Sequence, residues 1–291
     1  MAAVTSSPPG IAVIIPVLNG VTTLGEQLDA VLAQSVNKQF HVIVVDNGST
    51  DDTRGVIASY AERDDRVWFV DGSTVPRNAA AAKNLGVQST SAPRIAFCDA
   101  DDVVQPGWLA ALDSGLDAAD AVAGRLERHS LNPHIDPRDV PLYVDRYNVF
   151  GYAGLPGGNF GIHRDVYLLL GGLSDQPQYA EDSEFSIRLG RAGRTVHYQP
   201  TALVAIRLRT GAITSFRHAR ASYRAHHVLR STCGLPTPTV RRALRGTAGR
   251  LRWLMVHAHY LLDARRRLAW MRTAALLVAR FDDVKRNLFP G

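Results

Sequence analysis

Cysteine is scarce in this chain. The 291 residues include two cysteines, Cys98 and Cys233. Two cysteines are too few for a disulfide framework, and these two do not form a Cys-x-x-Cys pair that could hold a metal. We therefore predict two ordinary thiols, with Cys98 in the interior of a strand.

The sequence also lacks the apolar segments of exported and membrane-spanning proteins. Its first ten residues, MAAVTSSPPG, have neither the basic nor the apolar region of a secretory signal. Residues 251–281 contain no uninterrupted apolar run of about 18 residues, which argues against a transmembrane span. We expect residues 1–10 to be a disordered N-terminus and the protein to be cytoplasmic, peripheral at the inner face of the cell membrane.

Acidic residues are nearly absent from the C-terminal part. Residues 206–291 contain 18 basic and three acidic residues, whereas residues 1–205 contain 15 basic and 24 acidic residues. A basic tail on an acidic body indicates an anionic partner, such as phospholipid, nucleic acid or an anionic acceptor. The charge change predicts a domain over 11–205 and a basic α-helical extension over 206–291.

Apolar runs alternate with helical segments through the first domain. Each run is continuously apolar, as expected for strands covered on both faces, and each connection is long enough for a crossover helix. This order predicts an α/β fold with a Rossmann-type, mostly parallel sheet flanked by helices, and it places Trp68 and Trp108 in the core. The predicted strands are 11–18, 41–46, 66–71 and 94–99, and the predicted helices between them are 22–35, 52–62 and 77–88.

Carboxylates gather where the predicted strands end. Ligands of parallel sheets bind at the carboxyl ends of the strands, where Asp46 and Asp99 lie. Asp99, Asp101 and Asp102 would repel one another, and a hard divalent cation such as Mg²⁺ or Mn²⁺ would balance them. The alternative is that Asp101 or Asp102 caps the N-terminus of the next helix.

Six motifs then occur in an order that resembles the family 2 glycosyltransferases, which have the GT-A fold. The resemblance spans about residues 10–205. It implies an inverting, metal-dependent enzyme that moves a sugar from a nucleotide sugar, UDP-sugar favoured, to a hydroxyl of a saccharide or lipid-linked acceptor in cell-envelope glycan synthesis. The motifs are VIIPVLNG (13–20), VVDNGSTDDT (44–53), AKNLG (82–86), DADD (99–102), GGNFGIHRDV (157–166) and AEDSEFSIRLGRAG (180–193).

The resemblance also implies roles for individual residues. Asp101 would bind Mn²⁺ or Mg²⁺ directly and Asp99 would bind the metal or the ribose, while Asp182 would be the general base that activates the acceptor. The alternative for Asp182 is that it only completes the acidic first turn of a helix, which describes Glu184 well, since Glu184 can pair with Arg188. The predicted donor-binding residues are Pro16, Asn19, Asp46, Lys83, Asn84, Asp99, Gly158 and Asn159.

Some positions depart from the family pattern. Lys83 stands where the family usually has arginine, so its contact to the base carbonyl or a phosphate would be monodentate. Leu18 and Gly20 replace a common aromatic and a common acidic residue. Where the family often has a metal-binding or diphosphate-binding histidine, this chain offers Arg207 or Arg209.

The basic extension leaves three interpretations open: it lies on anionic lipid, it covers the catalytic domain, or it forms a homodimer seam. Two rival functions are weaker. A dinucleotide-dependent oxidoreductase would need Gly-x-Gly-x-x-Gly after the first strand, and PVLNGVTTL lacks it. A non-catalytic nucleotide-binding or nucleic-acid-binding module would keep the fold, but no aromatic RNA platform or DNA-reading motif supports it.

Overall fold

The computed structural model describes residues 9–138, 140–145, 147–176, 180–208, 211–235, 240–263, 266–267, 269–271 and 273–278. Most of the predicted disordered N-terminus, as well as Arg209, lies outside these residues. The chain divides into two compact units. The first comprises Met1–Glu127 and Tyr143–Arg207, and the second comprises Arg128–Leu142 and Leu208–Gly291.

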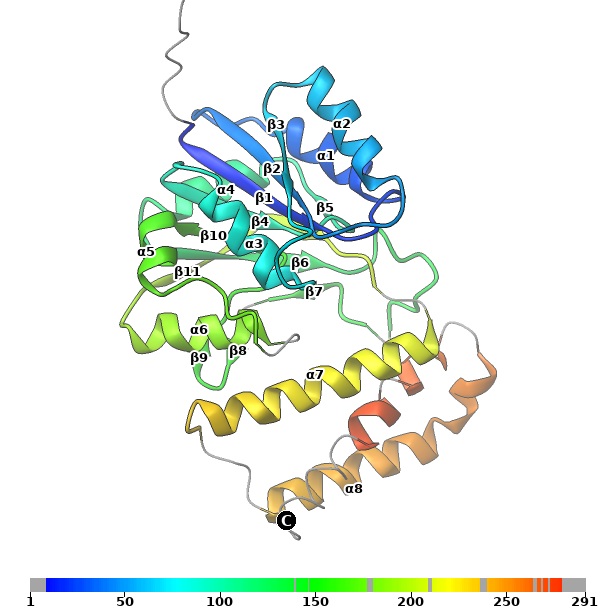
Figure 1. Cartoon of the computed structure of the whole chain (residues 1–291). Helices are drawn as coiled ribbons and strands as arrows, with labels where there is room; N and C mark the ends of the chain where they lie inside the picture. The colour runs from blue at the N-terminus through cyan, green and yellow to red at the C-terminus, as the bar shows by residue number, and fades with distance from the viewer. Residues whose placement is uncertain are drawn as a thin grey trace, which may run out of the picture. The chain divides into compact units, whose positions relative to one another are not determined.

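Four apolar segments form the parallel half of the sheet in the first unit (Figure 1). β1 lies between β2 and β4, and β3 is the edge strand beside β2. All four lie where the sequence predicts strands, because each is a continuous run of apolar side chains. Their bounds are β1 Ile11–Val17, β2 Phe40–Asp46, β3 Val67–Asp71 and β4 Arg94–Cys98.

The other half of the sheet is mixed. Its strands are β5 Val103–Val104, β6 Ala121–Glu127, β7 Tyr143–Val144, β10 Asn159–His163 and β11 Val196–Ala205, and a separate hairpin pairs β8 Asn148–Val149 with β9 Tyr152–Ala153. β10 is not predicted by the sequence pattern; it runs antiparallel between β4 and β6. This strand carries the glycine-rich turn before it to the carboxyl end of β4, since Asn159 pairs with Cys98.

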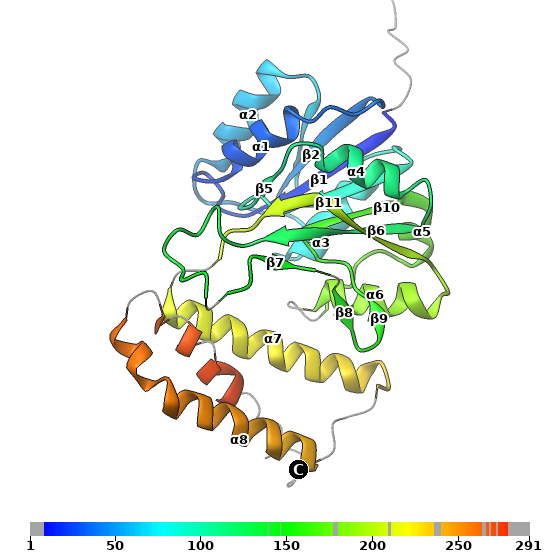
Figure 2. The same cartoon turned by 180° about the vertical axis from the view of Figure 1, so that it is seen from behind.

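Helices cover both faces of this sheet (Figures 1 and 2). On one face lie α1 Leu24–Leu32, α2 Thr53–Arg63 and α4 Trp108–Gly115; on the other lie α3 Ala79–Gln88, α5 Arg164–Leu169 and α6 Glu181–Arg191. Trp108 is fully buried, as predicted. Trp68 is not: it is 45% exposed, because β3 is the edge strand, and the prediction of a core position was wrong.

The second unit is largely helical. It contains α7 Ala212–Thr232, α8 Val240–Val256 and the 3₁₀ helix η1 Ala258–Leu262. Residues 128–142, which the charge pattern placed in the first domain, group with this unit, where Asp136 pairs with Arg266 (3.2 Å). Among the described residues, no helix combines the length and the apolar character needed to cross a membrane.

Candidate active site at the carboxyl ends of the parallel strands

The loop after β1 is tied to the loop after β2. Asn19 has a left-handed backbone (φ 56°), and its amide N donates to Ser49 Oγ (2.8 Å) while its Oδ1 accepts from Thr50 N (2.8 Å). Pro16 lies within β1, where it pairs with Val45. These bonds fix the two loops against each other at the edge where the sequence predicts donor binding.

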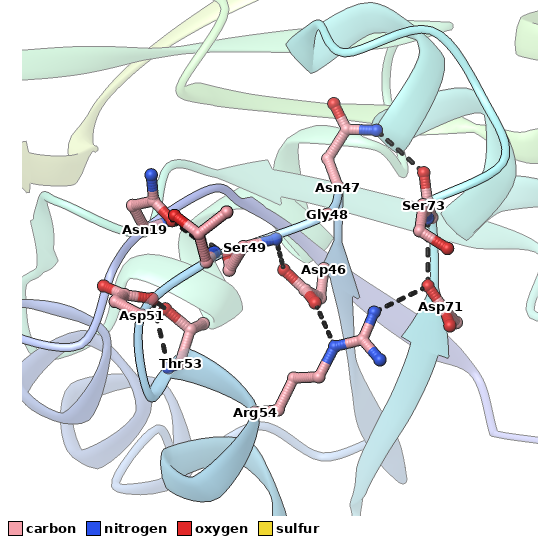
Figure 3. A network of polar contacts seen from close by, with 12 residues as sticks. Asn19, Asp46, Asn47, Gly48, Ser49, Asp51, Thr53, Arg54, Asp71 and Ser73 are labelled. Carbon is pink, nitrogen blue, oxygen red and sulfur yellow. Dashed lines mark hydrogen bonds and ion pairs between the residues drawn. The ribbon is translucent and has the colours of Figure 1, made fainter.

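Asp46 ends β2 with a fully buried carboxylate (Figure 3). Its oxygens accept from Ser49 N (2.9 Å) and from Arg54 Nε (2.7 Å), and Arg54 also donates to Asp71 Oδ1 (3.0 Å). Arg54 therefore joins the ends of β2 and β3. The structure gives Asp46 an internal ion pair where the sequence predicts a direct ligand contact.

Asp99 follows β4 and faces a buried lysine. Lys83 Nζ lies 3.0 Å from Asp99 Oδ1 and donates to Gly157 O (2.7 Å), although only 2% of its side chain is exposed. Burial alone would lower the pKa of Lys83, but Asp99, Glu181 and Asp182 together raise it above its ordinary value. The ammonium group is therefore held charged between carboxylates from β4 and α6.

The other two aspartates of the DADD segment differ in environment. Asp101 is exposed, whereas Asp102 is buried and accepts from Arg207 N (2.8 Å). Burial, together with the charges of Asp99 and Asp101, raises the pKa of Asp102 to about 8. Arg207 also donates through Nε to Asp101 O (3.0 Å), and its guanidinium contacts Glu26.

The DADD segment contains the residues that could hold a metal ion. Burial is the main cause of the raised pKa of Asp102, and the charges of Asp99 and Asp101 add to it. Because these carboxylates are close in the chain and carry like charges, a hard cation at Asp99 and Asp101 fits the chemistry of this edge. Within the described ranges, no group of three or more His, Cys, Asp and Glu side chains is arranged to hold a metal. Asp99 and Asp101 are two carboxylates of one short loop, and Asp99 is already paired with Lys83.

The glycine-rich turn before β10 lies between Asp99 and Asp182. A Cβ on Gly158 would lie 2.5 Å from Asp99 Oδ2, so only glycine lets this carboxylate pack against the turn. On the other side, Gly157 N donates to Asp182 Oδ2 (3.3 Å). The backbone of Gly157 therefore accepts a hydrogen bond from Lys83 through its carbonyl and donates one to Asp182 through its N–H.

The comparisons with known proteins agree with this geometry. The model of the family described as "Glycosyl transferase family 2" matches residues 12–167, more than half of the chain. The chain belongs to glycosyl transferase family 2. It is 27% identical over 212 residues to a "Probable glycosyltransferase YdaM" of Bacillus subtilis, which covers 67% of this chain and 50% of that protein.

Two further relatives of this family 2 chain are informative. It is 34% identical over 110 residues to a validoxylamine A glucosyltransferase of Streptomyces hygroscopicus, covering 38% of this chain and 26% of that protein. The chain thus spans half or less of the length of these curated relatives. Its fold matches a mannosyltransferase from Pyrobaculum calidifontis in complex with GDP-Man and Mn²⁺, with a TM-score of 0.64 and 20% identity over 98% of this chain and 88% of that one.

Two predicted donor-binding residues of this family 2 chain have other roles. Asn84 Oδ1 accepts from Tyr167 OH (2.6 Å) and Leu173 N (2.9 Å), which holds the chain after α5. Asn159 is fully buried; its Oδ1 accepts from Trp108 Nε1 (2.9 Å), and its Nδ2 donates to two backbone carbonyls. Both amides stabilise the fold beneath the site, and we leave them out of the proposed donor contacts.

Two residues of the site, Arg54 and Glu181, are not predicted from the sequence. Arg54 neutralises Asp46. A carboxylate at the end of a buried strand needs a cation close to it, and the signal in the sequence is the arginine at the start of the next helix. Glu181 is the first residue of α6. In the structure, burial and the neighbouring Asp182 raise the pKa of Glu181, and Lys83 counteracts them.

Proposed function

We propose that this family 2 chain is an inverting glycosyltransferase that moves a sugar from a nucleoside diphosphate sugar, UDP-sugar favoured, to an acceptor hydroxyl. One observation carries the proposal: Lys83, Asp99 and Asp182 meet at the peptide groups of Gly157 and Gly158. A carboxylate for the donor and a carboxylate for the acceptor thus lie on two sides of one short turn. The first unit would be the catalytic domain.

The donor would lie along the carboxyl ends of β1, β2 and β4. Asn19 and the loop after Pro16 would border the base, and Asp46 would act by holding Ser49 and Arg54 in place. Asp99 and Asp101 would hold a divalent cation, Mn²⁺ or Mg²⁺, in the manner of an Asp-x-Asp motif. When bound, the cation supplies Lewis-acid stabilisation of the departing diphosphate.

Asp182 would remove the proton from the attacking hydroxyl. Its position is fixed by the Gly157 amide and by Ser183 N, which donates to its Oδ1 (2.6 Å). A base on the acceptor side and a leaving group on the donor side permit one direct displacement, which inverts the configuration at the sugar carbon. Lys83 keeps positive charge beside both carboxylates.

The basic second unit would bring the enzyme to its acceptor. Residues 208–291 contain 17 basic and three acidic residues, so the extension is attracted to anionic membrane surfaces. A lipid-linked or cell-envelope glycan acceptor at the inner face of the membrane fits this charge. The enzyme would work there as a peripheral protein.

The test is a panel of UDP-, GDP- and dTDP-sugars with Mn²⁺, measured as thermal stabilisation of the full chain. A ligand present at about 100 times its Kd should stabilise the fold by about 2.7 kcal/mol. The sugar that stabilises is then offered with acceptors, and the anomeric configuration of the product is read by NMR. Absence of stabilisation by every nucleotide sugar, or retention of configuration, would contradict the proposal.

A further inference from the structure

The C-terminal end of α8 and the 3₁₀ helix η1 expose an unusual set of apolar side chains. Leu262 is 90% exposed, Met255 64% and Val256 61%, and Leu251 and Leu261 are also exposed. Single exposed leucines are ordinary on soluble proteins, but five large apolar residues within one short segment form a patch. We call Leu251–Leu262 the apolar tip.

The apolar tip is not part of the core of its own unit. Leu254 supplies the core side of α8: it is buried, and its carbonyl accepts from Trp270 Nε1 (3.0 Å). Leu251 and Met255 are about 40° apart around the helix, at about 100° per residue, and Met255 is about 100° away from Leu254. The helix therefore has a second apolar face, which the described part of the second unit leaves exposed.

Aromatic rings and arginines border this face. Trp253 stacks on His257 (4.3 Å between ring centroids) and meets Tyr260 edge-on (5.8 Å). Trp253 and Tyr260 are half-buried. Arg252 and Arg267 are exposed, and Arg267 Nε donates to Leu261 O (2.9 Å). Tryptophan and tyrosine with nearby arginines are typical of protein surfaces at the headgroup level of a bilayer.

We infer that the apolar tip inserts into the boundary between headgroups and acyl chains of an anionic bilayer, an inference that rests on the proposed membrane association of the second unit. The positive charge of the second unit favours a bilayer, rather than a second copy of this chain, as the partner of the apolar tip. A second copy would bring its own basic unit to the same place, and the like charges would repel. Anionic lipid instead supplies phosphates for the arginines and apolar chains for Met255 and Leu262.

The inference is tested with the full chain and vesicles of phosphatidylcholine, with and without phosphatidylglycerol. Met255→Ser/Leu262→Ser should lower the affinity for mixed vesicles by about tenfold or more, because two apolar side chains no longer leave water on binding. Leu169→Ser is the matched control: Leu169 is 69% exposed in the first unit, and its loss should leave vesicle binding unchanged. Wild-type affinity in the double variant would overturn the inference.

Insertion is separated from electrostatic attraction by fluorescence. Brominated phosphatidylcholine in the mixed vesicles should quench tryptophan emission, and Trp253→Phe should remove most of that quenching. Undiminished quenching in Trp253→Phe would overturn the inference, as would a change in the light-scattering mass of the double variant without vesicles, which would assign the tip to self-association.

The outcome is independent of the catalytic proposal. Mn²⁺-dependent UDP binding by calorimetry should be the same in the wild type and in Met255→Ser/Leu262→Ser. A chain that binds vesicles through the tip but turns over no nucleotide sugar would contradict only the proposed function. A chain that turns over a nucleotide sugar but binds vesicles equally well without the tip would contradict only this inference.

Discussion

Lys83 Nζ lies 3.0 Å from Asp99 Oδ1, and the same ammonium group donates to the carbonyl of Gly157 at 2.7 Å. The lysine is buried, so its charge is stable only because carboxylates face it. Through the Gly157 peptide it is also linked to Asp182. One side chain of α3 thus connects the predicted donor side of the site with the predicted base.

Replacing Lys83 by methionine should therefore impair both sides of the site. Lys83→Met keeps most of the volume but removes the charge and the bond to Gly157 O, and such a loss of alignment should reduce kcat/KM by about 100-fold. Lys38→Met is the matched control, since Lys38 pairs with Asp113 (2.5 Å) and has no contact with the proposed site. Steady-state kinetics decides: equal loss in the two variants would contradict a specific role for Lys83.

Asp101→Ala should remove the Mn²⁺-dependent part of nucleotide binding. Asp101 is the exposed carboxylate of the DADD segment, and a hard cation held there would lose a carboxylate ligand. Calorimetric titration with UDP, with and without Mn²⁺, measures this, and Asp65→Ala replaces an exposed aspartate elsewhere as the control. An unchanged Mn²⁺-dependent affinity in Asp101→Ala would remove Asp101 from the metal site.

Asp182→Asn should separate donor binding from chemistry. The amide keeps the size and an acceptor for Gly157 N but cannot take a proton, so donor affinity should persist while kcat falls by about 1,000-fold. Glu184→Gln lies on the same helical turn and changes only the ion pair with Arg188 (2.6 Å), so its kcat should stay close to that of the wild type. A wild-type kcat for Asp182→Asn would assign the base elsewhere.

Much of the fold could be predicted because β1, β2, β3 and β4 are continuous apolar runs with helices between them. The segment that contains β10 is different: GGNFGIH is short and rich in glycine, and its pairing with β4 joins residues about 60 to 70 positions apart. The sequence of a strand also does not show whether the strand lies at the centre or at the edge of the sheet. Trp68 was therefore predicted in the core although β3 is at the edge.

The candidate site shows the same limit. Its carboxylates could be predicted because strand ends mark one edge of a parallel sheet, and Asp99 and Asp101 lie together there. The ion pairs of Asp46 and Asp99 could not be predicted from the sequence. Arg54 and Lys83 reach these carboxylates only because α2 and α3 pack on the sheet. Neither ion pair has a fixed spacing in the sequence.

The pairing of Arg54 with Asp46 gives a stability prediction. Arg54→Met would leave a buried carboxylate without its cation, and because Arg54 is half exposed, water can partly replace it; the free energy of unfolding should fall by about 2–3 kcal/mol. Adding Asp46→Asn should recover part of this loss, since the buried carboxylate is then gone and only the half-exposed Asp71 has lost its cation. Denaturant unfolding of the two single variants and the double variant measures the coupling, and purely additive losses would contradict it.

His41 gives a prediction of pH-dependent stability. It is 3% exposed, its Nε2 hydrogen-bonds with Thr90 Oγ1 (3.1 Å), its ring stacks on Trp68 (4.3 Å), and its Nδ1 has no partner among the described residues. Burial lowers the pKa of His41 to about 4. Since the unfolded chain takes up the proton near pH 6.5 and the folded chain only near pH 4, stability is complete above pH 6.5 and falls as the pH drops between these values.

The wild type should therefore lose about 2 kcal/mol more of its unfolding free energy between pH 7.5 and pH 4.5 than His41→Gln does. Glutamine keeps a polar group near Thr90 Oγ1 but does not titrate, so comparing the two proteins cancels the titration of the carboxylates. His259→Gln is the control, because His259 is exposed and its replacement should keep the wild-type dependence. Urea unfolding at both pH values measures the difference. Parallel losses in the wild type and His41→Gln would show that His41 accepts its proton equally well in the folded and unfolded chains.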